Sequence, residues 1–121
     1  MIKGLRTVIY HVTDLDEAKR WYTAVLGFGP YFDEPFYVGF NVGGYELGLD
    51  PDPAGVVHGN NVEAYWGVDD IDSAMQRLKS LDSKAVSDIT DVGSGIRVAK
   101  VADPAGNVFG IIENPNFKIE I

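Results

Sequence analysis

The sequence predicts an α+β fold built from two tandem βαβββ modules, and three observations support this prediction. The first is an internal repeat, because residues 12–18 (VTDLDEA) match residues 68–74 (VDDIDSA) at a constant offset. The second is that each copy follows a strand-like segment rich in β-branched or aromatic residues and precedes apolar residues at helical spacing. The third is that short strand-like segments, separated by Gly, Pro and Asn, follow each predicted helix.

The length of the chain suits a single domain. With 121 residues and 13.2 kDa, of which 45% of the residues are hydrophobic, the chain has room for one compact core. We expect one domain over residues 1–121, with a first module at about 1–50, a linker at 51–60 and a second module at about 61–121. The linker is assigned from the density of Pro and Gly in residues 50–55.

In the first module, alternating residues from Leu5 to Val12 predict the opening strand. Thr13 or Asp14 is expected to cap the helix that follows, and Gly27 is expected to end it. The apolar stripe of that helix is Ala18, Trp21, Tyr22, Val25 and Leu26. Three strands are expected next: a weak one near Tyr31, then Phe36–Val42 and Tyr45–Leu49.

The second module repeats this order. Val62–Val68 predicts its first strand, and Asp69 or Asp70 is expected to cap the helix. The stripe of that helix is Ile71, Ala74, Met75, Leu78 and Leu81. The remaining strands are expected at Ala85–Ile89, Ile96–Val101 and Asn107–Glu113.

Composition excludes several classes of function. A net charge of −8 repels phosphate backbones and anionic lipid, so we expect no nucleic-acid partner and no membrane association. The absence of cysteine excludes disulfides, thiolate zinc sites and cysteine nucleophiles. No apolar run approaches the ~20 residues of a membrane helix and no secretory signal is recognisable, so a cytoplasmic protein is expected.

The duplicated element order, the run from Val12 to Phe28 and the Asp103–Asn107 segment together resemble the vicinal oxygen chelate superfamily. That superfamily includes glyoxalase I, bleomycin-binding proteins, extradiol dioxygenases and fosfomycin-resistance enzymes. The resemblance implies that the curved mixed sheets of the two modules form a ligand cup, with the helices outside. It also implies a homodimer, which the alternating tail Phe117–Ile121 favours because a partner subunit would cover its apolar residues.

Enzymes of this superfamily hold a divalent metal with His and Glu side chains from four related positions. The resemblance places these positions at Thr7, Gly48, Glu63 and Gly110. One carboxylate and one hydroxyl supply too few donors for a catalytic divalent ion. We therefore expect no metal and no other cofactor.

Strand alternation selects the candidate ligand-binding residues, because it sends Thr7, His11, Glu46, Glu63 and Tyr65 to the cup face. His11 could act as a base or a ligand contact, or be a half-exposed strand residue without a role. Glu63 could have a raised pKa and serve as a base or an anchor for a cation, or be a solvated carboxylate. Glu46 could contact the ligand, or protect an edge strand from aggregation.

Residues 31–37 place four aromatic and two acidic residues in one short segment. The segment could form an aromatic wall that stacks on a planar or cationic ligand, with Tyr31 and Phe36 as the candidate ligand contacts, or it could belong to ordinary core and an exposed turn. Trp21 and Trp66 are interpreted as core residues, and His58, in the linker, is given no role.

These features predict a small-molecule binding protein of the glyoxalase/bleomycin-resistance type, holding an organic ligand in an acidic, aromatic cup without the metal. One alternative is a lyase, isomerase or dioxygenase of the same superfamily, which would use a divergent metal set around Glu63, His11 and Glu46 or metal-free acid–base chemistry. A structural or regulatory dimer with a vestigial cup is a further alternative. The sequence assigns no catalytic residue.

Overall fold

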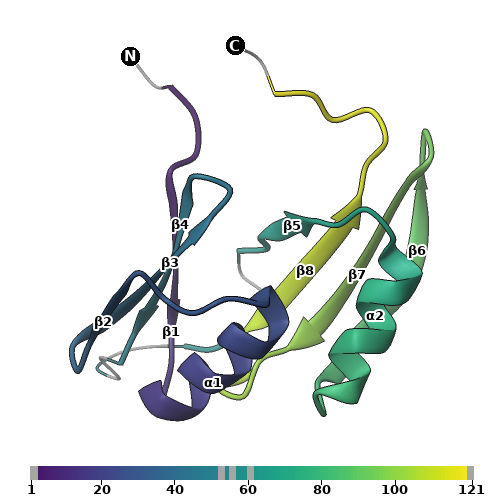
Figure 1. The fold of residues 1–121 in the computed structure, drawn as a ribbon. Coiled ribbons are helices and arrows are strands. Elements are labelled where there is room, and N and C mark those ends of the chain that lie inside the picture. The colour runs from purple at the N-terminus through teal and green to yellow at the C-terminus, as the bar shows by residue number, and fades with distance from the viewer. Residues whose placement is uncertain (1–2, 52–53, 55–56, 60–61, 120–121) are drawn as a thin grey trace. The chain divides into compact units, whose positions relative to one another are not determined.

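The computed structural model describes residues 3–51, 54, 57–59 and 62–119, and its element order is the predicted βαβββ repeat (Figure 1). The first repeat comprises β1 (Thr7–His11), α1 (Leu15–Leu26), β2 (Phe32–Glu34), β3 (Tyr37–Val42) and β4 (Tyr45–Asp50). The second comprises β5 (Tyr65–Gly67), α2 (Ile71–Ser80), β6 (Lys84–Gly93), β7 (Ile96–Ala102) and β8 (Val108–Glu113). The α+β class and the tandem βαβββ order are therefore confirmed.

The chain divides into two compact units. The first unit contains Met1–Gly59 and Pro104–Asn107, and the second contains Asn60–Asp103 and Val108–Ile121. The boundary at residues 59 and 60 falls within the predicted linker, of which residues 52, 53, 55, 56 and 60 lie outside the described part of the chain. That the two modules make one domain stays a prediction.

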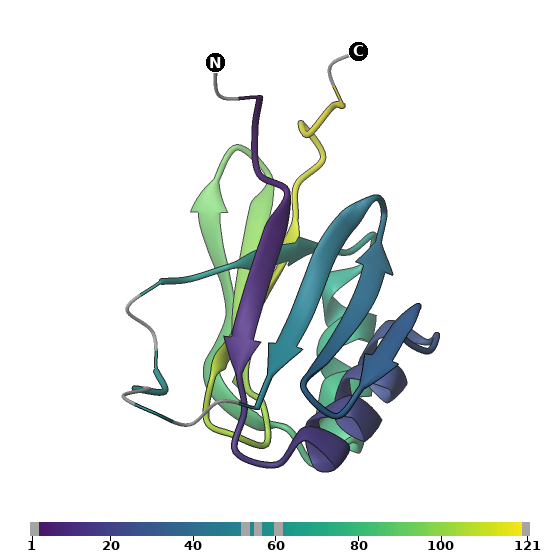
Figure 2. The same ribbon diagram turned by 90° about the vertical axis from the view of Figure 1, so that its left-hand side faces the viewer.

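The first unit is a mixed sheet with the strand order β1-β4-β3-β2, which Figure 2 shows side by side. β1 runs parallel to β4, and β3 is antiparallel to both of its neighbours. One face of this sheet is buried, and the residues that line it are Tyr10, Val38, Phe40, Leu47 and Leu49. Tyr10 packs on Tyr22 of α1 with ring centroids 5.6 Å apart, so α1 covers this face. The opposite face is the open face. Burial alternates along β1 as the sequence predicts, whereas in β4 Leu47, Gly48 and Leu49 are all buried and Tyr45 is exposed.

The ends of α1 follow the predicted signals. Of the two candidate caps, Asp14 is the one used, because its carboxylate accepts the Glu17 N–H at 3.0 Å. Gly27 ends the helix at φ +83°, a conformation that other residues adopt only at a cost.

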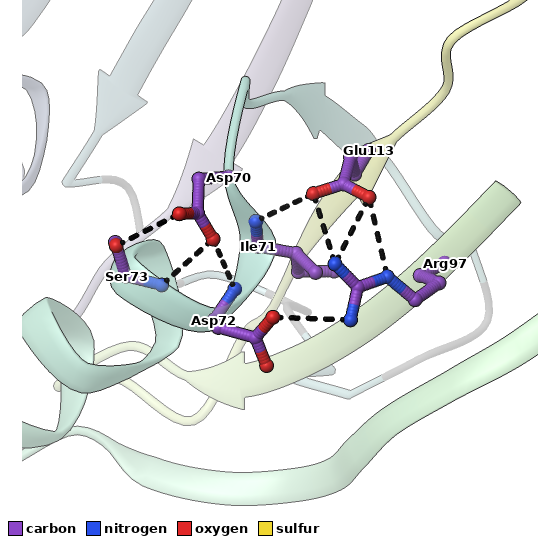
Figure 3. A network of polar contacts seen from close by, with 6 residues as sticks. All are labelled: Asp70, Ile71, Asp72, Ser73, Arg97 and Glu113. Atoms are coloured by element: carbon purple, nitrogen blue, oxygen red, sulfur yellow. Dashed lines mark hydrogen bonds and ion pairs between the residues drawn. The ribbon is translucent and has the colours of Figure 1, made fainter. Parts of the chain in front are cut away.

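The second unit is a mixed sheet with the strand order β5-β8-β7-β6. Asp70 caps α2 by accepting the N–H groups of Asp72 and Ser73. The Glu113 carboxylate of β8 accepts the N–H of Ile71 at 3.0 Å and hydrogen bonds from Nε and Nη2 of Arg97, so it joins the start of α2 to the sheet (Figure 3). The Ile71 N–H and then Arg97 hold the pKa of Glu113 below its usual value.

Several predicted boundaries were wrong. Phe36 lies in the turn between β2 and β3 rather than in a strand, because Pro35 interrupts the pairing. The strand predicted at Val62–Val68 is paired only over β5, whereas β6 continues past Ile89 to Gly93 with irregular pairing. Trp21 is buried as expected, but Trp66 is half-buried and stacks on Phe109.

Two further regions concern the predicted partners. Within the described residues, neither helix is long and apolar enough to cross a membrane.

The described part of the tail forms no helix or strand, and Phe117 and Ile119 are 68% and 78% exposed. Residues 120 and 121 lie outside the described chain, and the homodimer stays a prediction.

Candidate functional site

Two glycines lie next to each other on the two interior strands of the first unit, on its open face. Gly39 of β3 pairs with Gly48 of β4, so the two lie side by side without side chains. A Cβ at Gly48 would collide with the hydroxyl and ring of Tyr37, and a Cβ at Gly39 would lie 2.9 Å from Glu46 Oε2. The glycines therefore allow Tyr37 and Glu46 to lie flat against the sheet.

Glu46 accepts two phenolic hydrogen bonds above this patch. The Tyr31 hydroxyl donates to Oε1 at 2.6 Å, and the Tyr37 hydroxyl donates to Oε2 at 2.7 Å. The hydrogen bond to Glu46 raises the pKa of Tyr31, whereas burial and then the bond to Glu46 raise the pKa of Tyr37. Both phenols therefore keep their protons at neutral pH, and we call this arrangement the Tyr31–Glu46–Tyr37 cluster.

Aromatic side chains extend from the cluster toward β2. The Phe32 ring lies 6.2 Å from that of Tyr37 and 5.9 Å from that of Phe36, both between ring centroids. Tyr31 is 65% exposed and Phe36 is 67% exposed. The first unit thus carries an accessible aromatic surface beside a carboxylate, where the sequence predicted an aromatic wall.

Thr7 and His11 lie on the same open face. Thr7 pairs with Glu46 and His11 pairs with Asp50, with His11 Nδ1 at 3.8 Å from Asp50 Oδ2. The backbone carbonyl of His11 accepts the Asn107 side chain at 2.7 Å, and His58 Nε2 lies 3.0 Å from the same oxygen. His58, to which the sequence gave no role, therefore contacts the backbone of a candidate residue.

The second unit contains a related arrangement with an added cation. Tyr65 lies over Gly110, where a Cβ would be 2.7 Å from the tyrosine ring, and its hydroxyl donates to Glu63 at 3.2 Å. Lys100 Nζ lies 2.8 Å from Glu63 Oε1. Donation by Lys100 and then by Tyr65 lowers the pKa of Glu63. The expectation of a raised pKa was wrong, because a neighbouring ammonium outweighs desolvation.

The residues at the four positions where the resemblance predicts metal ligands, Thr7, Gly48, Glu63 and Gly110, do not fit a divalent ion. Gly48 and Gly110 offer no side-chain donor, and a tyrosine ring lies over each of them. Glu63 is already paired with Lys100. Among residues 3–51, 54, 57–59 and 62–119, no group of three or more His, Asp and Glu could hold a metal ion. The polar groups of the open face are therefore hydroxyls and carboxylates that bond to one another.

Hydrogen bonds connect some of the candidate ligand-binding residues that the sequence predicts. It joins Tyr31 to Glu46 and Tyr65 to Glu63, whereas Phe36 contacts the first pair only through other rings. Glu46 lies on an interior strand, so its interpretation as an edge-strand charge was wrong.

Tyr37 belongs to the aromatic segment recognised in the sequence, but its bond to Glu46 was not predicted, and Gly39 and Lys100 were missed. The usable signal was register, since Gly39 stands opposite Gly48 and Lys100 stands opposite Gly110.

Comparison with known proteins gives the family. The model of the Glyoxalase/Bleomycin resistance protein/Dioxygenase superfamily matches residues 4–111. No significant match was found among curated proteins. A glyoxalase-related enzyme from Fulvimarina pelagi has a similar structure, with a TM-score of 0.79 and 20% identity over 98% of this chain and 94% of that one.

Two further solved structures share the fold. The genomically encoded fosfomycin resistance protein FosX from Listeria monocytogenes has a TM-score of 0.79 and 15% identity, over 96% of this chain and 97% of that one. A glyoxalase/bleomycin resistance protein from Catenulispora acidiphila has a TM-score of 0.72 and 22% identity, over 93% and 100%. With the family model matching most of its length, this chain belongs to the glyoxalase/bleomycin resistance protein/dioxygenase superfamily.

Proposed function

We propose that this protein binds an organic small molecule on the open face of its first unit, without the divalent metal that enzymes of the superfamily use. The observation that carries the proposal is the position of Tyr37, whose ring covers Gly48 while its hydroxyl donates to Glu46. At the position that corresponds to a metal ligand, the chain thus has an aromatic ring and a hydrogen-bonded carboxylate. These are groups that contact an organic ligand directly.

The surroundings of the cluster support a ligand rather than a purely structural role. Small-molecule sites combine apolar and aromatic surface with a few fixed polar groups. Here the exposed rings of Tyr31 and Phe36 supply the aromatic surface, and Glu46 is fixed by two hydroxyls. Thr7 and His11 flank these groups on the same face. Glu63 and Tyr65 are proposed as ligand contacts of the second unit.

Metal analysis and thermal shifts test the metal-independent part of the proposal. Protein purified without a metal-binding tag or chelator is expected to contain no stoichiometric transition metal. Manganese, iron, nickel and zinc should each leave its melting temperature essentially unchanged. A stoichiometric metal, or a stabilisation of several degrees that disappears in Glu63→Ala, would favour the enzyme alternative with a divergent metal set.

A ligand screen tests the binding part. In amide NMR spectra of the chelator-treated protein, a fragment library of neutral, cationic and anionic aromatic compounds is expected to shift the resonances of Gly39, Glu46 and Gly48 selectively. A library without any compound that shifts these three resonances would refute binding at this face.

Two further proposals concern the state of the protein in the cell. We infer a homodimer from the exposed tail residues Phe117 and Ile119, and a cytoplasmic location from the acidic, cysteine-free composition. Light scattering of the full chain should give twice the mass of 13.2 kDa at micromolar concentration, and removal of residues 117–121 should shift it toward the monomer. A monomeric full chain would contradict the dimer, and recovery in a secreted fraction would contradict the location.

A further inference from the structure

We propose that the group recognised by the Tyr31–Glu46–Tyr37 cluster is a planar cation with several N–H donors, such as a guanidinium or an amidinium attached to an aromatic ring. This inference rests on the proposed function and specifies its ligand class. It follows from the hydrogen-bond inventory, the charge and the shape of the open face.

The hydrogen-bond inventory of the cluster leaves acceptors only. Tyr31 and Tyr37 each have one hydroxyl proton, and each donates it to a different oxygen of Glu46. Both phenolic oxygens keep a lone pair, and the carboxylate oxygens keep further acceptor capacity. A ligand that needs donors from the protein, such as a carboxylate or a phosphate, would have to break these bonds. A ligand that brings N–H donors would use them as they stand.

The charge of the open face favours the same class. Three of the residues that pair across the four strands on this face are acidic: Glu34, Glu46 and Asp50. None of the paired residues on this face is Lys or Arg. Lys19 of α1 forms an ion pair with Asp33, which alternates to the other face of β2. The face therefore attracts a cation and repels an anion.

The repeat provides an internal comparison for this charge. In the second unit the residue opposite Gly110 is Lys100, and its ammonium compensates the Glu63 carboxylate at 2.8 Å. In the first unit the corresponding residue opposite Gly48 is Gly39. The second unit thus satisfies its carboxylate with an internal cation, whereas the first satisfies Glu46 with neutral phenols. A ligand cation on the first unit would take the place that Lys100 fills on the second.

The shape of the cluster selects a planar, aromatic cation. Gly39 and Gly48 make the sheet flat beneath the Tyr37 ring, and the rings of Phe32 and Phe36 continue from it. Covering exposed rings with an aromatic ligand is favourable, and a cation over the face of a ring adds an electrostatic attraction to this contact. A small aliphatic ammonium would satisfy the charge and leave the rings exposed.

Three nearly isosteric probes test the inference: benzamidinium, benzamide and benzoate. Titrated into the full-length protein and followed by amide NMR, benzamidinium is expected to shift Gly39, Glu46 and Gly48. Benzamide should bind at least about tenfold more weakly, and benzoate should not bind. Glu46→Gln should lower benzamidinium affinity about tenfold and remove its advantage over benzamide.

The control variant is Glu17→Gln on α1, which makes the same change in net charge away from the open face. It should leave all three affinities unchanged, and unshifted amide resonances elsewhere would show that both variants are folded. Equal binding of benzamide and benzamidinium, or an intact preference in Glu46→Gln, would overturn the inference. If only neutral or anionic compounds shift the same three amides, the ligand class is wrong but the proposed function stands. If no compound shifts them, both fail.

Discussion

The hydroxyl of Tyr37 occupies the space where a side chain at Gly48 would begin. Gly48 has no functional group, but its missing side chain allows the Tyr37 ring to lie against β4. In this position the Tyr37 hydroxyl reaches the Glu46 carboxylate. In the second unit the ring of Tyr65, rather than its hydroxyl, lies over Gly110, and the backbone oxygen of Ala64 is equally close to the position of a Cβ there. Both repeats thus place a tyrosine ring over a glycine at the strand position where the resemblance to the superfamily predicts a metal ligand.

Substitution of Gly48 tests the close approach of Tyr37. In Gly48→Ala the new methyl group must displace Tyr37, so the variant is expected to lose about 1–3 kcal/mol of stability through overpacking. Chemical denaturation measures this loss. Gly29→Ala is the matched control, because a Cβ there meets nothing within 4 Å, and it should be nearly neutral. Combining Gly48→Ala with Tyr37→Ala should relieve the clash, so an additive double variant would contradict the account.

Tyrosine titration tests the bonds to Glu46. The pKa of Tyr31 is raised chiefly by its bond to Glu46, whereas the pKa of Tyr37 is raised chiefly by burial. Glu46→Gln should therefore return Tyr31 toward its usual value of 10.0 and leave Tyr37 still raised. Carbon NMR of the tyrosine Cζ atoms resolves the two residues. An equal change in the pKa of both tyrosines in Glu46→Gln, or no change in either pKa, would contradict the hydrogen-bond geometry.

The same shifts predict a dependence of stability on alkaline pH. A group whose folded pKa exceeds its unfolded value contributes stability that is fully present below the unfolded pKa and is lost as pH rises through the folded one. Tyr31 and Tyr37 should therefore stabilise the fold below pH about 10 and lose this contribution above it. The free energy of unfolding, measured by chemical denaturation at a series of alkaline pH values, should fall less steeply with pH in Tyr37→Phe than in the parent protein.

The junction between α2 and its sheet predicts the acid response. The lowered pKa of Glu113 means that its contribution is present above the unfolded value of about 4.5 and is lost as pH falls through the folded pKa. Glu113→Gln should reduce the melting temperature at neutral pH and make the acid limb of the stability profile less steep. Glu34→Gln is the control, since it removes an exposed carboxylate from the other unit. An unchanged acid limb in Glu113→Gln would refute this role.

Lys100 should control the titration of Glu63. Because donation by Lys100 is the largest cause of the lowered pKa of Glu63, Lys100→Gln should raise that pKa, and Tyr65→Phe should raise it less. Carboxyl carbon NMR during an acid titration measures both variants. A larger change in Tyr65→Phe would reverse the assigned order of causes.

Much of the fold could be predicted because the repeat and the strand period depend on nearby residues. The offset between the two copies predicted the element order, and alternation predicted the buried face of β1 and, in β4, the burial of Leu47 and Leu49 but not the exposure of Tyr45. Strand neighbours were harder to predict, since β4 lies between β1 and β3 and its Glu46 is therefore interior. Only pairing across strands fixes such placement.

The candidate site was predictable only in part for the same reason. Tyr31 and Glu46 were recognisable as a ring and a charge, but the bond between them depends on the register of β3 with β4. Lys100 was missed because it meets Glu63 through strands distant in the sequence. The pKa of Glu63 was consequently predicted with the wrong sign.

The most direct test of the central claim is an amide NMR titration of the chelator-treated protein with an aromatic compound that the ligand screen identifies. Saturable shifts centred on Gly39, Glu46 and Gly48 are expected, with an affinity that added divalent metal does not change and that Glu46→Gln weakens. Binding that appears only when a divalent metal is added, or saturable shifts that avoid these three residues, would contradict the claim.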